Sequence, residues 1–119
     1  MPKTLVIGAS EDRMRYANMA VHTLIRKDQE VVAIGKKEGM IYGIEIQKGY
    51  PPLTDIHTVT LYLNPMNQQK YYDYIISLNP KRVIFNPGTE NPEFYELLHQ
   101  NNIEFEEACT LVLLNTNNY

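Results

Sequence analysis

Cysteine and long apolar runs are scarce in this chain of 119 residues. Cys109 is its one cysteine, which excludes a disulfide within the chain and is typical of reducing compartments, so we expect a cytoplasmic protein. No apolar run approaches the roughly 20 residues that a membrane-spanning helix needs. We therefore expect no contact with a membrane.

The chain also lacks a large excess of either positive or negative charge. Lys and Arg number 11 against 14 Asp and Glu, and the cations form no clustered excess. This excludes the electrostatic footprint of a nucleic-acid-binding protein. What is present is a hydrophobic content of 44%, enough for one core, and the length suits a single domain over residues 1–119.

The N-terminal stretch has the pattern of a strand, a loop and a helix. Residues 4–7 form an apolar run that ends at Gly8, and a helical pattern begins near Tyr16. An unalternating run predicts a buried parallel strand, and a glycine before a helix allows a phosphate to approach the main chain closely. Of the three glycines in the dinucleotide fingerprint only Gly8 is present, because Ser10 and Arg13 occupy the other two positions. The alternative, that Gly8 only turns the chain from strand to helix, therefore has about the same weight as a phosphate-binding loop.

Strand and helix patterns alternate along the whole chain. This predicts an α/β fold, a single Rossmann-like, doubly wound parallel sheet of five strands with helices on both faces and the strand order 3-2-1-4-5. We expect residues 39–57 to form a long irregular stretch with at most a short strand at 44–46, and residues 115–119 to fray. The expected strands are 4–7, 30–34, 59–63, 82–85 and 103–105, and the expected helices are 16–27, 66–78, one beginning at Pro92 and a short one within 108–114.

In such folds ligands bind beyond the carboxyl ends of the strands, where this chain carries small residues, amides and cations. Lys36 and Lys37 follow the second strand, where an NAD-binding unit has an acidic residue. They favour a ligand with an additional phosphate on its ribose, with a solvated basic turn as the alternative. The other loops at this edge are Gly8 to Arg15, Asn64-Pro65 and Asn86-Pro87-Gly88.

The sequence contains no recognisable set of catalytic residues. None of His22, His57 and His99 lies at a predicted strand end facing the Gly8 loop, and metal-ligand spacings are missing, so we expect no metal site. Cys109 lies in an apolar stretch, which is more typical of a small core residue than of a nucleophile.

Seven features keep a particular order along the chain: Val6-Ile7-Gly8-Ala9-Ser10 with Arg13 downstream, Val31-Val32-Ala33-Ile34 ending in a basic loop, Gly43, the segment from Tyr50 to Ile56, Gly88, Asn91 and Cys109. In this order the chain resembles the small stand-alone CoA-binding domain family, which is similar to the CoA-binding Rossmann domain of succinyl-CoA synthetase. The resemblance spans nearly the whole chain.

The resemblance implies a CoA-type ligand above the strand ends. It places the main chain of Gly8, Ala9 and Ser10, together with Arg13, near the diphosphate. It places Lys36 and Lys37 near the adenosine and its 3′-phosphate, with Asn64 and Pro65 beside the cleft and Asn86 and Gly88 at the next strand end. Two features depart from the family: Gly35-Lys36 stands where an Asn-Pro pair is frequent, and Glu11 and Asp12 would repel phosphate unless they point away.

These observations predict a non-catalytic module that binds CoA or acyl-CoA. Three alternatives stay open: a domain that binds NADP or another nucleotide, a protein-interaction domain with a vestigial cleft, and a small transferase that uses Cys109. Tyr71, Tyr72 and Tyr74, if exposed, would make a homodimer or another protein partner possible.

Overall fold

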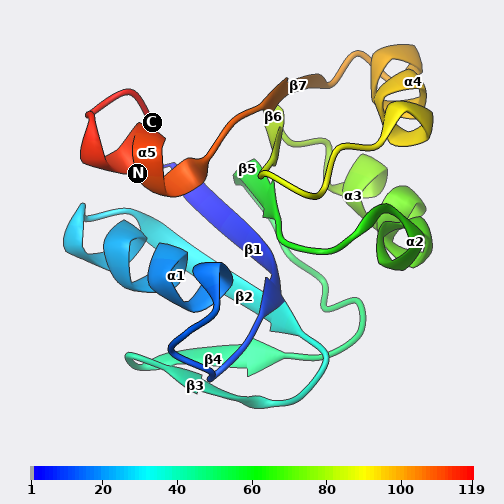
Figure 1. The fold of residues 1–119 in the computed structure, drawn as a ribbon. Coiled ribbons are helices and arrows are strands. Elements are labelled where there is room, and N and C mark those ends of the chain that lie inside the picture. The colour runs from blue at the N-terminus through cyan, green and yellow to red at the C-terminus, as the bar shows by residue number, and fades with distance from the viewer. Residues whose placement is uncertain (1) are drawn as a thin grey trace.

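The computed structural model describes residues 2–119, and Met1 lies outside the described residues. Within this range the strands form one sheet in the order β3-β4-β2-β1-β5-β6-β7 (Figure 1). All neighbouring strands are parallel except β3, which is antiparallel to β4. The strands are β1 (Lys3–Ala9), β2 (Glu30–Gly35), β3 (Gly39–Ile41), β4 (Ile44–Gln47), β5 (Ile56–Leu61), β6 (Arg82–Phe85) and β7 (Glu104–Glu107).

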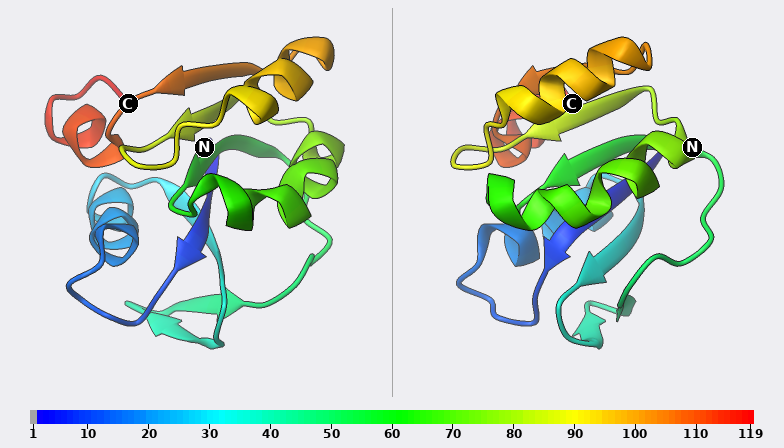
Figure 2. Two further views of the ribbon diagram at one scale, coloured as in Figure 1. Left: turned by 45° about the vertical axis from the view of Figure 1, so that its right-hand side comes forward. Right: turned by 90° about the vertical axis from the view of Figure 1, so that its right-hand side faces the viewer.

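Helices cover both faces of the sheet, as predicted (Figure 2). Alternate side chains of β1 divide the core, because Leu5 and Ile7 pack with one set of helices and Val6 with the other. The first face carries α2 (Pro65–Gln68), the 3-10 turn η1 (Gln69–Tyr71), α3 (Tyr72–Leu78) and α4 (Pro92–Gln100). The second face carries α1 (Tyr16–Arg26) and α5 (Thr110–Asn115). Among residues 2–119 no helix is long and apolar enough to cross a bilayer.

The prediction of five strands is wrong, because residues 39–47 form a hairpin; the short strand expected at 44–46 is present as β4, and β3 was not expected. β3 and β4 pair through Met40↔Glu45 and are joined by Tyr42 and Gly43, whose φ angles are 49° and 83°. Positive φ at both turn residues matches the twist of the two strands. Ile41 and Ile46 are buried by this hairpin. The sequence signal is weak because tyrosine, unlike asparagine, rarely adopts positive φ.

The predicted strand order is also wrong. The strand predicted third, β5, pairs with β1 and not with β2, so the five predicted strands have the order 2-1-3-4-5. The physical reason is that β4 already occupies the edge of β2, through the pair Ala33↔Ile46. The helices after β1 and β5 lie on opposite faces, so the switch point of the sheet lies between β1 and β5.

Several element boundaries differ from the prediction, two of them substantially. β5 begins at Ile56 rather than at residue 59, and the predicted helix 66–78 is interrupted by η1. The interruption follows Gln68, a buried side chain whose Nε2 donates to the carbonyl oxygens of Leu63 and Thr89, each at 2.8 Å. This polar anchor ties the start of the segment to neighbouring loops, whereas α3 buries Ile75 in the core.

The C-terminal segment follows one prediction and departs from another. α5 is the expected short helix on the sheet, and Leu114 is buried against it. Residues 116–119 do not fray, because the Tyr119 hydroxyl hydrogen-bonds to that of Thr4 and the Arg82 guanidinium lies 4.5 Å from the Tyr119 ring centre. The end of the chain is therefore attached to its first strand.

The tyrosines expected to be exposed are largely packed. Tyr71 is buried, and Tyr72 and Tyr74 are half-buried. Tyr71 and Tyr74 lie against Tyr50, and Tyr72 stacks on Phe94 at 4.4 Å. These rings complete the core beneath α3 and α4, so they give no support to a dimer interface.

Candidate functional site

A cleft of about 680 Å³ lies at the carboxyl ends of β1, β2 and β5. This is the switch point of the sheet, where α/β folds bind their ligands. The cleft brings together six of the residues predicted from the sequence and adds several that sequence reasoning missed. Its lining consists of Gly8, Ala9, Ser10, Glu11, Asp12, Arg15, Lys36, Lys37, Glu38, Tyr62, Leu63, Asn64 and Asn67.

Two glycines allow the strand ends to approach one another. Gly8 has φ of 100°, and a Cβ there would lie 3.0 Å from the carbonyl carbon of Tyr62. Gly35 ends β2, and a Cβ there would lie 2.3 Å from the carbonyl oxygen of Ala9. Both positions need glycine, one for its backbone conformation and both for space. The floor of the cleft is therefore main chain.

The loop after β1 is held by its own side chains. The Ser10 hydroxyl accepts a hydrogen bond from the Asp12 amide, and Asp12 Oδ1 accepts one from the Met14 amide at 3.0 Å. Asn18, buried in α1, donates from Nδ2 to the Ser10 carbonyl at 2.9 Å. These bonds fix the loop without a bound ligand, because short polar side chains satisfy the nearby backbone groups.

The two acids of this loop have partners within the protein. Glu11 Oε2 accepts a hydrogen bond from the Met40 amide of β3 at 2.9 Å. Asp12 Oδ2 lies 3.7 Å from Arg15 Nε. Both carboxylates still line the cleft, and these contacts offset part of their negative charge. The hairpin that sequence reasoning missed is thus what positions Glu11.

The cations divide between two places. Lys36 and Lys37 are exposed, line the cleft, and form no ion pair with any of residues 2–119. Arg15 lines the cleft as well, a residue that sequence reasoning passed over in favour of Arg13. Arg13 lies instead in a separate hollow, beside Arg26. The structure therefore brings together both lysines and Arg15, but not Arg13.

The loop after β5 contributes amides. Asn64 is the N-cap of α2, and its Oδ1 accepts a hydrogen bond from the Asn67 amide at 2.9 Å. Pro65 occupies the first helical position, where its missing N–H costs nothing, and it is not among the lining residues. Asn67 is a cleft residue that the sequence did not single out.

The residues predicted after β6 lie outside the main cleft. Asn86 is buried, and its Nδ2 donates to Thr60 Oγ1 at 2.7 Å and to the Leu61 carbonyl at 2.9 Å. Its Oδ1 accepts from the Thr110 amide, so Asn86 joins β5, β6 and α5. Gly88 forms an exposed turn with φ of 92°. Asn86 supports the site from below, whereas Gly88 does not line the cleft.

Tyr62 is a site residue that sequence reasoning missed. It follows β5, and its main-chain amide donates to the Ile7 carbonyl at 2.9 Å. Burial raises the pKa of the Tyr62 hydroxyl to about 12, and the Thr60 and Thr110 hydroxyls beside it offset part of the rise. Those two hydroxyls hydrogen-bond to each other, and the buried Tyr62 hydroxyl makes no hydrogen bond of good geometry to any described residue.

The histidines lie away from the cleft. His22 packs edge-on against Tyr42, His57 lies in β5 with Nδ1 2.8 Å from Thr58 Oγ1, and His99 lies in α4. Within residues 2–119 no group of three His, Cys, Asp or Glu side chains could hold a metal ion.

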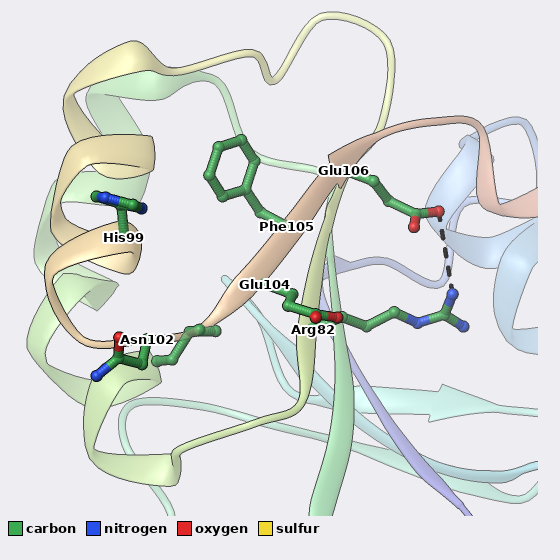
Figure 3. Close-up of a pocket in the computed structure, with 7 residues that line it drawn as sticks. Arg82, His99, Asn102, Glu104, Phe105 and Glu106 are labelled. Atoms are coloured by element: carbon green, nitrogen blue, oxygen red, sulfur yellow. Dashed lines mark ion pairs between the residues drawn. The ribbon is translucent and has the colours of Figure 1, made fainter.

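A hollow of about 480 Å³ lies at the opposite end of the sheet, between the end of α4 and the start of β7 (Figure 3). Arg82 in this hollow is 3.9 Å from Glu106 and donates to Thr58 Oγ1 at 3.0 Å. Glu104 and Glu106 line it as well. Its one arginine is paired and it has no lysine, whereas the cleft has two lysines without an ion-pair partner among the described residues, so the cleft suits a phosphate better.

Comparisons with known proteins agree with this geometry. The protein-family model described as CoA binding domain matches residues 2–115. The crystal structure of an uncharacterized protein superposes on this chain with a TM-score of 0.97, and the two sequences are 46% identical. The match covers 100% of this chain and 98% of the other. No curated protein matches the chain significantly.

Two more distant solved structures share the fold. A protein from Thermus thermophilus, cell-free ID.343, has a TM-score of 0.85 at 18% identity, covering 99% of this chain and 90% of the other. A conserved hypothetical protein from Pyrococcus furiosus has a TM-score of 0.83 at 21% identity, and the match covers 94% of this chain and 98% of the other. The family match extends over almost all of the sheet and the cleft, so this chain belongs to the CoA binding domain family.

Proposed function

We propose that the protein binds coenzyme A, free or acylated, in the cleft between β1, β2 and β5, and that it performs no catalytic step of its own. Family membership supports the class of ligand. The observation that carries the proposal is that Gly8, Ala9 and Ser10 line one cleft together with Lys36 and Lys37.

The two parts of the cleft suit two parts of the ligand. The main chain of Gly8, Ala9 and Ser10 approaches the diphosphate, and Arg15 lies in the same lining. Lys36 and Lys37 have no ion-pair partner among the described residues, so they are available to the 3′-phosphate of the ribose. Charge-assisted hydrogen bonds of this kind are about twice as strong as neutral ones.

A binding role is favoured over a chemical one by the side chains of the cleft. Among the residues that line it there is no histidine or cysteine, and the Ser10 hydroxyl accepts from the Asp12 amide, with no hydrogen bond to a basic side chain among the described residues. Cys109 lines a different hollow and is half-buried. A small transferase that uses Cys109 would need a base beside the thiol, and no histidine lines that hollow.

The ligand class is tested by isothermal titration calorimetry with CoA, dephospho-CoA, NADP and NAD. We expect CoA to bind most tightly. Tighter binding of NADP than of CoA would instead support the other nucleotide, whose ribose also carries a phosphate that Lys36 and Lys37 could contact. Binding of none of the four would contradict the proposal and favour a vestigial cleft.

The role of the basic loop is tested by the double substitution Lys36→Glu with Lys37→Glu. We expect the affinity for CoA to fall at least about tenfold, because hydrogen bonds to a charged group contribute about 1.5–3 kcal/mol each. Dephospho-CoA, which lacks the 3′-phosphate, should lose much less. Lys48→Glu with Lys81→Glu, two exposed lysines outside the cleft, is the matched control of charge. Equal losses for both ligands would show that the loop does not contact the ribose phosphate.

A further inference from the structure

A second, smaller hollow of about 210 Å³ adjoins the cleft. Tyr62 lines both, so its side chain lies at their junction. The hollow is formed beyond the ends of β5 and β6, between the first residue of α1 and the start of α5. Its lining consists of Tyr16, Tyr62, Asn86, Pro87, Cys109 and Leu111.

The chemistry of this hollow differs from that of the cleft. It has no charged residue in its lining, whereas the cleft carries two lysines, an arginine and three carboxylates, of which Glu11 and Asp12 have partners within the protein. The Asn86 amide, its most polar group, is already bonded to Thr60, Leu61 and the Thr110 amide. What remains is the surface of Pro87, Cys109, Leu111 and two tyrosine rings. Together the two spaces suit a ligand that is anionic at one end and apolar at the other.

Among residues 2–119 the Tyr62 hydroxyl is the one buried side-chain nitrogen or oxygen without a hydrogen-bond partner, and it lies beside the Thr60 and Thr110 hydroxyls. A buried polar group without a hydrogen bond is rare in folded proteins and costs about 1–3 kcal/mol. With almost no accessible surface, this hydroxyl points into the protein, so it is the ring of Tyr62 that lines the two spaces.

We infer that the hollow receives the short acyl group of an acyl-CoA, which passes the Tyr62 ring at the junction of the two spaces. This inference rests on the proposed function, because the phosphates of the ligand must lie in the adjoining cleft. An apolar cavity of about 150 Å³ holds benzene, so a hollow of 210 Å³ accommodates an acyl chain of about two to five carbons. Longer chains project into solvent and gain nothing more.

The test is titration calorimetry of the full chain with CoA and with acetyl-, butyryl- and octanoyl-CoA. From acetyl to butyryl we expect affinity to rise about tenfold, since each methylene that leaves water contributes about 0.8 kcal/mol. Octanoyl-CoA should bind no more tightly than butyryl-CoA. If CoA binds but affinity does not depend on acyl length, the inference is overturned and the proposed function stands. If neither CoA nor any acyl-CoA binds, the proposed function fails and the inference fails with it.

Two substitutions test the inference. Leu111→Trp fills the hollow and should remove the gain from acetyl to butyryl, whereas Val112→Trp, on the exposed neighbouring position, should retain it. A gain that survives in Leu111→Trp would contradict the assignment. Circular dichroism of each variant verifies that it is folded.

Discussion

Single residues decide whether the cleft can exist, and Gly35 is the sharpest case. Its backbone does not need positive φ; it is the space that excludes a side chain, because the Ala9 carbonyl oxygen and the Ile46 side chain occupy the position of a Cβ. Gly49 is the opposite case, with φ of 73° and nothing within 4 Å of a Cβ. The two glycines therefore separate steric crowding from backbone strain.

We expect Gly35→Ala to lower the free energy of unfolding by about 2–3 kcal/mol, the upper range for overpacking, because backbone must move. Gly49→Ala should cost about 1 kcal/mol, the penalty of a left-handed conformation alone. Urea denaturation measures both. A Gly35→Ala variant as stable as the wild type would show that the ends of β1 and β2 can separate freely.

His57 makes the stability depend on pH. Burial, and then the positive charges of Arg82 and Lys81, lower the pKa of the His57 imidazole below its ordinary value of 6.5. The unfolded chain therefore binds more protons between the lowered value and 6.5, so the free energy of unfolding falls as the pH drops through this window. Above 6.5 both states are neutral at this residue and its contribution vanishes.

Replacement of the imidazole tests this linkage. We expect His57→Gln to lose less stability than the wild type between pH 7.5 and pH 5, measured by thermal unfolding at closely spaced pH values. His99→Gln, at the exposed end of α4, keeps His57 and serves as the matched control. Parallel pH profiles for the wild type and His57→Gln would contradict the expectation.

At the scale of elements, the β3–β4 hairpin and the loop after β1 form one structural unit. Glu11 is the link, because its carboxylate accepts from the Met40 amide on the unpaired edge of β3 and lies against Gly39. This contact draws a negative charge toward the hairpin and leaves the loop main chain at the floor of the cleft. Glu38 lines the same cleft and forms no ion pair with any of residues 2–119.

We expect Glu11→Ala to speed hydrogen exchange of the Met40 amide, because the amide then loses the Glu11 carboxylate as acceptor and the exposed strand edge opens to water. Glu38→Ala removes the same charge from the cleft and should leave that amide protected. NMR exchange measurements on both variants decide the matter. Unchanged protection of Met40 in Glu11→Ala would show that the carboxylate does not hold the hairpin edge.

At the scale of the whole molecule, the two ends of the chain are joined across the sheet. The Tyr119 ring packs on the second face of the sheet, bonds to Thr4 and lies beside the Arg82 guanidinium. Arg82 in turn reaches Glu106 of the edge strand β7. The tail thus connects β1, β6 and β7, so its removal should lower the stability of the whole domain.

We expect Tyr119→Ala to lower the free energy of unfolding by about 2–4 kcal/mol, since a large aromatic ring leaves a mostly buried position. Asn118→Ala, on an exposed position, should change it by less than about 0.5 kcal/mol. Chemical denaturation of both variants gives the comparison. Equal stability of Tyr119→Ala and the wild type would show that the tail is frayed in solution, as the sequence suggested.

Sequence alone determined the alternation of elements, the helices on both faces and the edge of the sheet at which polar loops gather. These follow from local causes: the unalternating run before Gly8, the stripe of α1, and Pro92 after the N-cap Asn91. Six predicted residues line the cleft for the same reason, since parallel strands place their carboxyl ends at one edge.

Tertiary structure alone decided the strand order, the hairpin and the division of the cations. β5 pairs with β1 because β4 occupies the edge of β2, a competition between segments far apart in the chain. Arg15 rather than Arg13 lines the cleft because loop hydrogen bonds, made by Asp12 and Asn18, set the direction of each side chain. The spacing of apolar residues indicates which face of a helix or strand is buried. Which strands lie next to each other, and how each loop turns, depend on contacts between segments that are far apart in the sequence.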